Sequence, residues 1–430
     1  MTNARDRLSV YIDRLESEAS VEKLAAHLSA TGAELPPAIR PTKHVNRKSL
    51  EACWETLQHA GADDEAQSQI ADLQTLESLE QYERNIESCI GTVKVPVGVI
   101  GPLRINGLHA RGDFYVPLAT TEASLVASYG RGARLISASG GCAVALLNDG
   151  LCRSPGFAFR TIAEAGQFTH WVLKHFTELK AAAESTTRHG RLVGFNPHME
   201  GNHVYLLCEY TTGDASGQNM TTIATEALCR TLLAQCPLKP EYWFLEANFS
   251  GDKKASNLSF LTVRGKKVTA EVRLPAQLVT RYLHTDIVMM QRYWRMSALG
   301  GVMSGTMGVQ GHYANGLAAL YLATGQDVAC VAESSIGVTR MEIEDDLLYA
   351  SVTLPNIIVG TVGGGTGLPS QNAGLRLLGL AGAGKARALA EVCAAVCLAG
   401  ELSLIGAICA GQFAAAHQAL ARERGDDHAG

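Results

Sequence analysis

The sequence predicts a mixed α+β protein of two or three domains. Its 430 residues exceed what one ordinary hydrophobic core holds. Residues 1–86 are polar with apolar residues at helical spacing, whereas the chain from Gly91 onward is rich in glycine and in short apolar runs typical of strands. Blocks of helix and blocks of strand therefore follow one another, which is typical of an α+β fold.

Further segments carry recognisable patterns. Residues 161–185 have the spacing of a helix, and the alternation over residues 203–210 predicts a strand. Residues 258–275 predict a β-hairpin that turns at Arg264 and Gly265, because glycine favours tight turns. Beyond this hairpin we expect mostly helix with two glycine-rich breaks.

Composition narrows the function class. The net charge of −5, with 18% charged residues, offers no basic surface for nucleic acid or anionic membranes. The 11 cysteines are scattered without CxxC pairs, which favours a reducing cytosol. Residues 1–20 have the spacing of a soluble helix, not of a signal peptide. The most apolar stretch, residues 392–416, is interrupted by Glu401 and Gln412, so we expect a buried helix and a cytoplasmic protein.

Two segments have features of phosphate-binding turns. DASGQNMTT, residues 214–222, lies between the predicted strand and a helical segment, and free N–H groups at a helix start attract anions. A plain connection has the same composition. GLAGAGKA, residues 379–386, fits GxxxxGK, but Ala386 stands where a Ser or Thr hydroxyl is needed, so a turn between helices is favoured. No GxGxxG follows a strand, which argues against an ordinary Rossmann turn.

Two more motifs leave alternatives open. GTVGGGTGLP, residues 360–369, has the glycine density that lets a backbone approach a ligand closely, or it is a flexible loop. GDKKAS, residues 251–256, places two lysines beside an aspartate. It is either a solvated charge run or a lysine, held by a carboxylate, that stabilises an oxyanion.

Three isolated polar residues are candidate catalysts. Glu122 is the only charge between Pro117 and Gly130, so it either acts as an acid with a raised pKa or caps a helix with the threonines before it. Asp327 and His417 lie in apolar helical segments, where a core or surface role is the common alternative.

In their order, these motifs resemble class I 3-hydroxy-3-methylglutaryl-CoA (HMG-CoA) reductase, in a soluble prokaryotic form without the membrane anchor. The resemblance covers about residues 80–420 and rests on VKVPVGVIGPL, VPLATTEASLVAS, GDASGQNM, GDKKAS, GQDVA, GTVGGGTGL and AAAH. It implies a helical region over residues 1–86, a large substrate domain over 87–154 and 244–430, and an inserted ferredoxin-like NADPH domain over 155–243.

The resemblance also implies catalytic roles. Reduction of a thioester to an alcohol takes two hydrides. Lys253 would stabilise the oxyanion, and His417, as imidazolium, would protonate the coenzyme A thiolate as mevaldyl-CoA collapses to mevaldehyde. Glu122 would protonate the alkoxide. Asp327 would lie between Lys253 and Glu122, keeping the lysine protonated and raising the pKa of the glutamate.

Other matches imply ligand contacts. Arg188 follows Thr187 in a pair that contacts the adenosine phosphate, and its guanidinium favours NADPH over NADH. No metal is implied, and the partner is a second copy in a homodimer or dimer of dimers whose active site is completed across the subunit boundary. The positions implied for the cofactor are Thr187, Arg188, Asp214, Ser216, Gly217, Gln218, Asn219, Gly363 and Gly364, where Ser216 and Gln218 stand in place of the family's methionines. The positions implied for the substrate are Ser128, Arg131, Arg153, Lys254, Arg295 and Asn315.

Some positions depart from the family pattern. Glu246 replaces a serine that touches substrate, and this extra carboxylate repels an anion unless it points away or is paired. Arg295 replaces a lysine, ESCIG over residues 87–91 replaces ENVIG at the dimer contact, and Ala123 replaces a glycine. The alternatives are a homologue that oxidises mevalonate or takes a related acyl-CoA, and a non-catalytic acyl-CoA or nucleotide binder.

Overall fold

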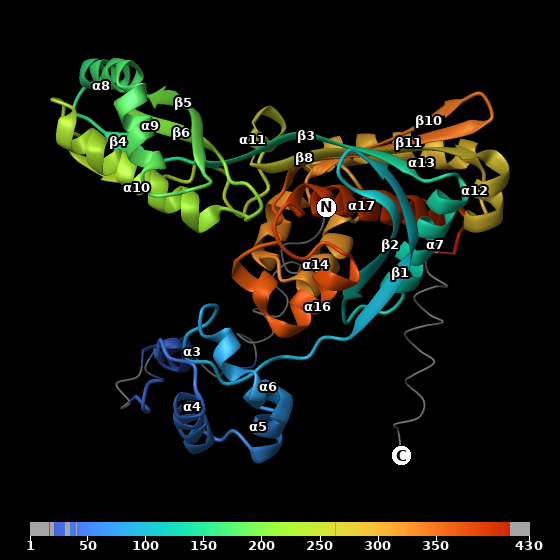
Figure 1. Ribbon diagram of the computed structural model, residues 1–430, viewed down its shortest axis with the longest axis horizontal. Coiled ribbons are helices and arrows are strands. Elements are labelled where there is room, and N and C mark those ends of the chain that lie inside the picture. Colours follow the sequence, from blue (N-terminus) through green and yellow to red (C-terminus); the bar gives the residue numbers. More distant parts are fainter. Residues whose placement is uncertain (1–16, 18–20, 31–34, 40, 263, 413–430) are drawn as a thin grey trace. The chain divides into compact units, whose positions relative to one another are not determined.

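The computed structural model divides the chain into two compact units, residues 1–92 and 93–430 (Figure 1). The helix expected over residues 1–20 falls almost entirely outside the described residues, and so does His417. The residues that the structure describes are 17, 21–30, 35–39, 41–262 and 264–412.

The first unit is helical, as its sequence predicts. Side-chain oxygens cap three of its helices, at Asn46, Asp63 and Asp72. Trp54 lies in its small core and donates from the indole Nε1 to the carbonyl of Ile90 at 2.8 Å, which joins α4 to the ESCIG segment. The elements are α3 (Val21–Leu28), α4 (Arg47–His59), α5 (Asp64–Ile70), α6 (Leu73–Glu77) and the 3-10 helix η1 (Leu79–Tyr82).

The second unit is built on one open sheet, with eleven strands in the described residues. The main path runs β7-β4-β6-β3-β8-β11-β10-β9, with β5 beside β6 and the β1–β2 pair beside β3. The strands are β1 (Val97–Gly107), β2 (Arg111–Ala119), β3 (Cys142–Arg153), β4 (Gly156–Ala158), β5 (Arg191–Glu200), β6 (His203–Thr211), β7 (Tyr242–Phe244), β8 (Gly265–Pro275), β9 (Gly308–Val309), β10 (Gly337–Glu344) and β11 (Leu347–Ile357).

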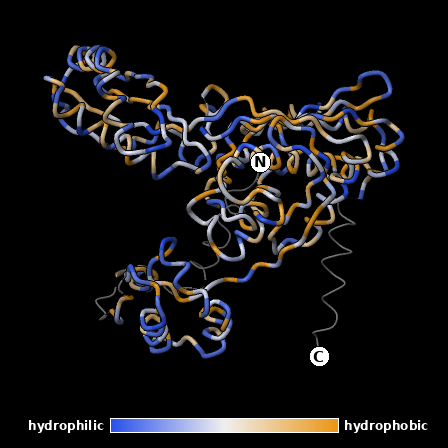
Figure 2. The backbone as a smooth tube through the Cα atoms, in the orientation of Figure 1, coloured by the Kyte–Doolittle hydropathy of each residue, from blue (hydrophilic) through white to orange (hydrophobic). Residues whose placement is uncertain are grey.

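Helices cover this sheet and join its strands. Within the large part of the unit they are α7 (Leu125–Ala138), α11 (Leu258–Leu261), α12 (Ala276–Leu283), α13 (Ile287–Ser304), α14 (Tyr313–Thr324), α15 (Val331–Ser334), α16 (Pro369–Leu377) and α17 (Ala386–Cys409), with the 3-10 helices η2 (Val328–Cys330) and η3 (Gly364–Gly367). The strands that pass over α17 in Figure 1 are largely hydrophobic in Figure 2. In β8 every second side chain, from Val268 to Leu274, is buried.

Helix α17 is the centre of the large core. Its side chains are buried on nearly every side, and it packs against β8, β11, α7 and α14. Among the described residues it is the one helix with the length and composition of a membrane span, and 83% of that span is buried inside the protein. The expected buried helix is therefore confirmed over residues 392–409.

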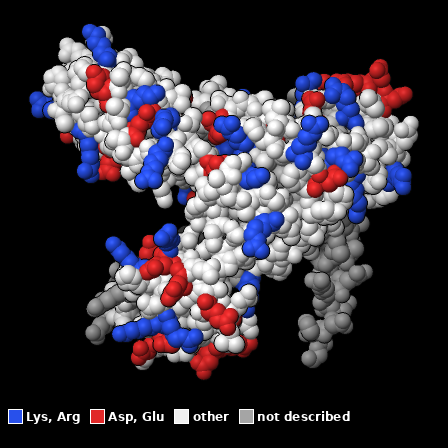
Figure 3. Space-filling view, viewed as in Figure 1, with Lys and Arg blue, Asp and Glu red and all other residues white. Residues whose placement is uncertain are grey.

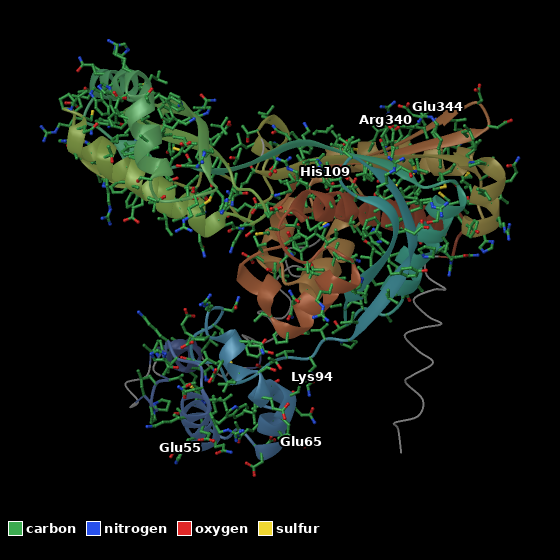
Figure 4. All side chains as sticks on the ribbon, viewed as in Figure 1. Glu55, Glu65, Lys94, His109, Arg340 and Glu344 are labelled. Carbon is green, nitrogen blue, oxygen red and sulfur yellow. The ribbon has the colours of Figure 1, made fainter. Side chains whose placement is uncertain are left out.

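A buried carboxylate ties α17 to the sheet. Glu391 is fully buried and accepts the backbone N–H groups of His109 at 2.8 Å, Ala110 at 2.7 Å and Leu146 at 3.2 Å. His109, labelled in Figure 4, lies on the turn between β1 and β2. The carboxylate thus satisfies backbone donors of two different strand pairs.

The inserted segment begins where β3 leaves the large sheet. Residues 143–150 of β3 pair with β8, whereas residues 151–153 pair with β6. The inserted strands lie in the order β5-β6-β4-β7, each antiparallel to its neighbour. Three helices pack on this small sheet around Phe157, Phe168 and Leu228. These helices are α8 (Ile162–Lys174), α9 (Phe176–Glu184) and α10 (Gln218–Gln235).

Several element predictions need correction. The hairpin over residues 258–275 is wrong, because residues 258–261 form α11 and β8 is a central strand that starts at Gly265. Arg264 is fully buried and does not lie at an exposed turn. The expectation of mostly helix after this segment misses β9, β10 and β11. The helix over residues 161–185 is two helices that meet at His175.

Substitutions at two glycines of α7 would show how closely this helix approaches α17. A Cβ at Gly132 would lie 1.9 Å from the carbonyl oxygen of Ala399, so we expect Gly132→Ala to lower the free energy of unfolding by about 1–3 kcal/mol or more. At Gly130 the nearest atom is 3.7 Å away, so Gly130→Ala gains helix propensity of about 1 kcal/mol. Urea unfolding of both variants measures this difference, and equal effects would contradict the close approach.

Candidate active site

Lys253 and Asp327 form an ion pair. Lys253 lies in the loop between β7 and α11, with its Nζ 2.9 Å from Oδ2 of Asp327. Asp327 starts η2, where its Oδ1 accepts the N–H of Ala329 at 3.0 Å. Both paired side chains are 42% exposed. The hydrogen bond to Asp327 raises the pKa of Lys253, so an ammonium ion is kept where a ligand can reach it.

The backbone of Lys253 is held as well. Its φ is 55°, in the left-handed region, which costs a residue with a side chain about 1–3 kcal/mol. Its N–H donates to Oε1 of Glu333 in α15 at 3.0 Å. Glu333 is fully buried, and burial raises its pKa against the opposing effect of Arg264.

A chain of alternating charges continues from Glu333 beneath this loop. Arg264 donates to Glu333 from Nε at 2.6 Å and to Asp252 from Nη2. Asp252 also accepts from Nη1 of Arg153 at 2.9 Å, and the same Nη1 is 3.3 Å from Glu246. Burial opposes charge on both Arg264 and Asp252, but their partners outweigh it: the pKa of Arg264 is raised and that of Asp252 is lowered. Both groups therefore stay charged.

Both carboxylate oxygens of Glu246 accept hydrogen bonds from neighbouring residues. Its Oε1 accepts the N–H of Asn248 at 2.9 Å, and its Oε2 accepts the hydroxyl of Ser250 at 3.0 Å in addition to Arg153. Of the alternatives the sequence leaves open, the structure selects a paired carboxylate. Glu246 therefore shapes the loop that carries Lys253 and neutralises part of the charge of Arg153.

Glu122 lies in the wall of a cavity of about 500 Å³. Its Oε1 accepts from Nδ2 of Asn315 at 3.4 Å, and its N–H donates to Oγ1 of Thr120 at 3.0 Å. The cavity lies between α7, the start of α14 and the end of α17. Its lining includes Glu122, Ser124, Ser128, Arg131, Arg134, Gly311, His312, Asn315, Leu404 and Ala407.

Two predicted substrate residues line the same cavity from α7. The hydroxyl of Ser128 is 2.9 Å from that of Ser403 on α17, and Arg131 donates from Nε to the same hydroxyl at 3.1 Å. Burial, with the neighbouring charge of Arg134, lowers the pKa of Arg131. Two guanidinium groups therefore share one end of the cavity, an arrangement that suits an anionic ligand.

The two groups of catalytic candidates lie at opposite ends of α14. Asn315, which contacts Glu122, is in the first turn, whereas Asp327 follows the last residue, Thr324. At 1.5 Å per residue, about 14 Å of helix separates Asn315 from Thr324. Asp327 contacts Lys253 as predicted, but within the described part of one chain it does not lie between Lys253 and Glu122.

For three predicted site residues, the described part of the chain gives no side-chain contact with either Glu122 or the Lys253–Asp327 pair. Arg295 is exposed on α13, and its charge acts on Glu342 of β10. Lys254 is exposed, and its Nζ donates to the carbonyl of Asp252 at 2.8 Å. His417 lies outside the described residues, and the helix that precedes it, α17, ends beside the cavity of Glu122.

The predicted cofactor turn leads from β6 into α10. Gly217 is the N-cap with φ 82°, and a Cβ there would lie 2.3 Å from Cγ2 of Thr212, so the turn requires glycine. Ser216 and Asn219 are exposed on either side of it. Among the described residues no side chain caps α10, so its first N–H groups remain available to an anion.

Asp214, at the start of this turn, caps another helix. Its two carboxylate oxygens accept the N–H groups of Gly384 at 2.7 Å and Ala386 at 3.2 Å, at the start of α17. The GLAGAGKA segment is thus the turn between α16 and α17, as favoured by its sequence, and a carboxylate occupies the N–H groups that a phosphate would need.

The turn that carries Arg188 lies beside the start of α10. Oγ1 of Thr187 accepts the N–H of Gly190 at 3.0 Å, and Arg188 is exposed between them. A Cβ at Gly190 would lie 2.6 Å from the thioether of Met220, in the first turn of α10. The structure therefore brings Arg188 and the cofactor turn, which are far apart in the sequence, close together.

The glycine-rich segment after β11 lies against the turn between β6 and α10. Gly360 donates to Oε1 of Gln326 at 2.8 Å, and a Cβ on it would lie 2.6 Å from the backbone nitrogen of Ser216. Gly363 and Gly364, with φ of 73° and 54°, face open space. Positive φ values and close backbone approach explain the density of glycine here.

Gln218 links the cofactor turn to the ion pair. Its Nε2 donates to Sγ of Cys330 at 2.7 Å, and Cys330 follows Asp327 by three residues. Burial raises the pKa of Cys330 to about 12, so the thiol stays protonated. The predicted cofactor turn is therefore joined by a hydrogen bond to the segment that carries Asp327.

Asp252, Arg264 and Glu333 are site residues that sequence reasoning misses. Asp252 is visible in GDKKAS only as a neighbour of the lysines. Arg264 is mistaken for a turn residue because glycine follows it. Glu333 is an isolated charge in the apolar segment ACVAESS, and the criterion that selects Glu122 would have selected it as well.

Comparison with known proteins identifies the family. The family model described as hydroxymethylglutaryl-coenzyme A reductase matches residues 49–422. The chain belongs to the hydroxymethylglutaryl-coenzyme A reductase family. HMG-CoA reductases of Methanocaldococcus jannaschii and Aeropyrum pernix are 43% and 44% identical, over 79% and 81% of this chain and 85% and 84% of theirs.

Solved structures of HMG-CoA reductases share the fold. A class II enzyme from Streptococcus pneumoniae, described as bound to NADPH in open conformations, matches with a TM-score of 0.61 at 20% identity, over 83% of this chain and 96% of that one. A second structure from the same organism gives 0.60 at 19% identity. The reductase fold of this chain is therefore shared across a large distance in sequence.

The ion pair makes a prediction about protonation. Asp327→Asn replaces the charged acceptor that raises the pKa of Lys253 with a neutral amide, so that pKa falls toward 10.5 and the lysine loses its charge at lower pH than in the wild type. NMR titration of the lysine Nζ measures this change. Asp113→Asn, which breaks a pair with Arg104 in the β1–β2 hairpin, is the control and leaves Lys253 unchanged. An unshifted pKa in Asp327→Asn would contradict the assigned pairing.

Proposed function

We propose that this protein reduces HMG-CoA to mevalonate and coenzyme A in the mevalonate pathway. The observation that carries this proposal is identity of 42–44% to archaeal HMG-CoA reductases over about four fifths of the chain. The alternatives, mevalonate oxidation or a related acyl-CoA, are not favoured by these relatives. The pairing of Glu246 with Arg153 also removes the reason to expect an altered acyl group.

We propose NADPH as the reductant. Its nicotinamide supplies a hydride in each of the two reduction steps. The residues fit such a ligand: the uncapped start of α10 offers N–H groups to a phosphate, and Arg188 offers an exposed guanidinium beside it. Asp214 acts here by fixing the turn, since both of its carboxylate oxygens bind α17.

The domain assignment stays a proposal with structural support. The order β5-β6-β4-β7, with helices α8 and α9 before β5 and α10 before β7, is what a ferredoxin-like domain requires over residues 155–243. The helical region would span residues 1–86, and the large substrate domain residues 87–154 and 244–430.

Lys253 is the proposed oxyanion stabiliser. Its ammonium, fixed by Asp327, is exposed and charged at neutral pH, which lets it donate to the thioester oxygen as negative charge develops there. Lys254, which is exposed beside Lys253, would add positive charge for the substrate carboxylate. Arg153 is 7% exposed and paired with Asp252 and Glu246, so it would act by holding the loop of Lys253 in place. Asp327 needs no proton of its own, because its role is to hold the ammonium.

Glu122 and His417 are the proposed proton donors. Glu122, held by Asn315, would protonate the alkoxide that becomes the alcohol. His417, as imidazolium, would protonate the departing coenzyme A thiolate. Ser128 and Arg131, in the wall of the same cavity, would contact coenzyme A.

We propose a homodimer or dimer of dimers in which each active site combines Glu122 of one subunit with Lys253 of another. Glu122 and Lys253 lie at opposite ends of α14 in one chain, so a second copy must supply the missing half. Helix α13 supports this, since Met296, Leu299, Val302 and Met303 are between 67% and 83% exposed. Arg295 shares a face with Leu299 and Val302, so a second copy would bring it to the substrate.

The class I, soluble and cytoplasmic form is part of the same proposal. A reductase of Aspergillus fumigatus is 38% identical over 77% of this chain, well above the 20% identity to the class II structure. This chain spans 30% of that fungal protein. On the face in Figure 3, Lys and Arg are interspersed with Asp and Glu, which fits a protein that acts on small molecules.

The activity is tested by following absorbance at 340 nm with HMG-CoA and either NADPH or NADH, with a thiol assay for coenzyme A. We expect two NADPH oxidised per thiol released and slower oxidation of NADH. Arg188→Ala should reduce the preference for NADPH. A folded protein that oxidises neither cofactor would contradict the proposed reductase.

Shared active sites are tested by mixing two inactive variants. A dimer of one Glu122→Gln subunit and one Lys253→Ala subunit contains one site with both residues intact and one with both replaced. Random reassembly makes half of the dimers mixed, so about a quarter of wild-type activity should return. No recovery, with subunit exchange verified by mass, would place Glu122 and Lys253 of one reaction in the same chain.

A further inference from the structure

One short segment contacts Lys253 at two points. Asp327, which caps η2, and Glu333, in α15, are six residues apart. Asp327 binds the side chain of Lys253 at Nζ, and Glu333 binds its backbone N–H. Both distances, 2.9 Å and 3.0 Å, are those of good hydrogen bonds.

The second contact matters because of the lysine's conformation. At φ 55° Lys253 is in a region that residues with side chains rarely adopt, and the conformation persists only when its surroundings hold it. The direction in which the side chain leaves the loop follows from this φ. An acceptor on the backbone N–H therefore controls where the ammonium lies.

Only a carboxylate meets the demands on Glu333. Its Oε1 accepts the N–H of Lys253 and its Oε2 accepts Nε of Arg264, and the glutamate and the arginine are both buried. A carboxylate has two acceptor oxygens, whereas an amide has one acceptor and one donor. Glutamine would place its NH₂ group against either the N–H of Lys253 or the guanidinium.

We propose that Glu333 is a positioning residue for the reaction. It fixes the backbone of Lys253 while Asp327 fixes the side chain, so that the ammonium is placed for the thioester oxygen. The inference rests on the proposed role of Lys253 and adds a residue that touches neither substrate nor cofactor. A shift of about 1 Å in a catalytic group is enough to lower a rate by up to roughly a hundredfold.

The chain offers a matched control for the loss of a buried carboxylate. Glu391 is also fully buried and accepts three backbone N–H groups, but it contacts the β1–β2 turn and β3, not the loop of Lys253. Glu391→Gln therefore reproduces the general cost of replacing a buried glutamate. It should lower the melting temperature and leave turnover per folded protein unchanged.

We expect Glu333→Gln to lower kcat roughly tenfold to a hundredfold, with KM for HMG-CoA and NADPH within about twofold of the wild type. Glu333→Asp keeps the negative charge beside Arg264 but shortens the side chain by about 1.5 Å, so it should fold more stably than Glu333→Gln and still lose kcat. In both variants the pKa of Lys253, measured by NMR at Nζ, should fall, because the ammonium withdraws from Asp327.

Several results would overturn the inference. A folded Glu333→Asp with wild-type kcat and an unshifted Lys253 pKa would remove the positioning role. An equal loss of kcat in Glu391→Gln would show that any buried carboxylate has this effect. If the wild type itself shows no turnover, the proposed reductase fails, and the NMR readout still tests whether Glu333 places Lys253.

Discussion

The structure of the site depends on the chain of alternating charges from Glu333 through Arg264, Asp252 and Arg153 to Glu246, of which Glu333, Arg264 and Arg153 are buried. Removing one partner of the buried Arg264–Glu333 pair leaves an uncompensated buried charge, at a cost of about 3–5 kcal/mol. Its members come from five places along the sequence. Arg153 ends β3, where the chain leaves for the inserted segment, and Glu246 follows β7, where it returns. The same charges that support Lys253 therefore fix the root of the inserted segment.

The sequence predicts the Lys253–Asp327 pair better than the chain of charges beneath it. Lys253 and Asp327 belong to short motifs with a recognisable composition, and their pairing is confirmed at 2.9 Å. Arg264 does not stand out, because its burial is decided by Glu333 and Asp252, 69 and 12 residues away. Local spacing reports on neighbours within a helix or strand, and it cannot show which distant charges will compensate a buried arginine.

In the fold too, elements set by local patterns are predicted from the sequence, and elements set by distant contacts are not. The strand over residues 203–210 and the buried helix over residues 392–409 are set by local patterns and are confirmed. The segment at Arg264 is not, because a glycine beside a charged residue usually marks a turn, and here Gly265 starts a central strand against the carbonyl of Ile357. The β10–β11 hairpin is missed as well. Its tip, near Glu344, is acidic and β10 carries the Arg340–Glu342 pair, whereas β11 is apolar and largely buried (Figures 3 and 4).

The capping of α17 by Asp214 has a consequence for how this protein can change. An aspartate whose two oxygens hold the start of the central core helix is not free to vary with the identity of a dinucleotide. Arg188, by contrast, lies exposed on a turn that the core does not need. Under the proposed role of Arg188, adaptation to a different redox pool would proceed at this residue, while the turn beside it is inherited unchanged with the core.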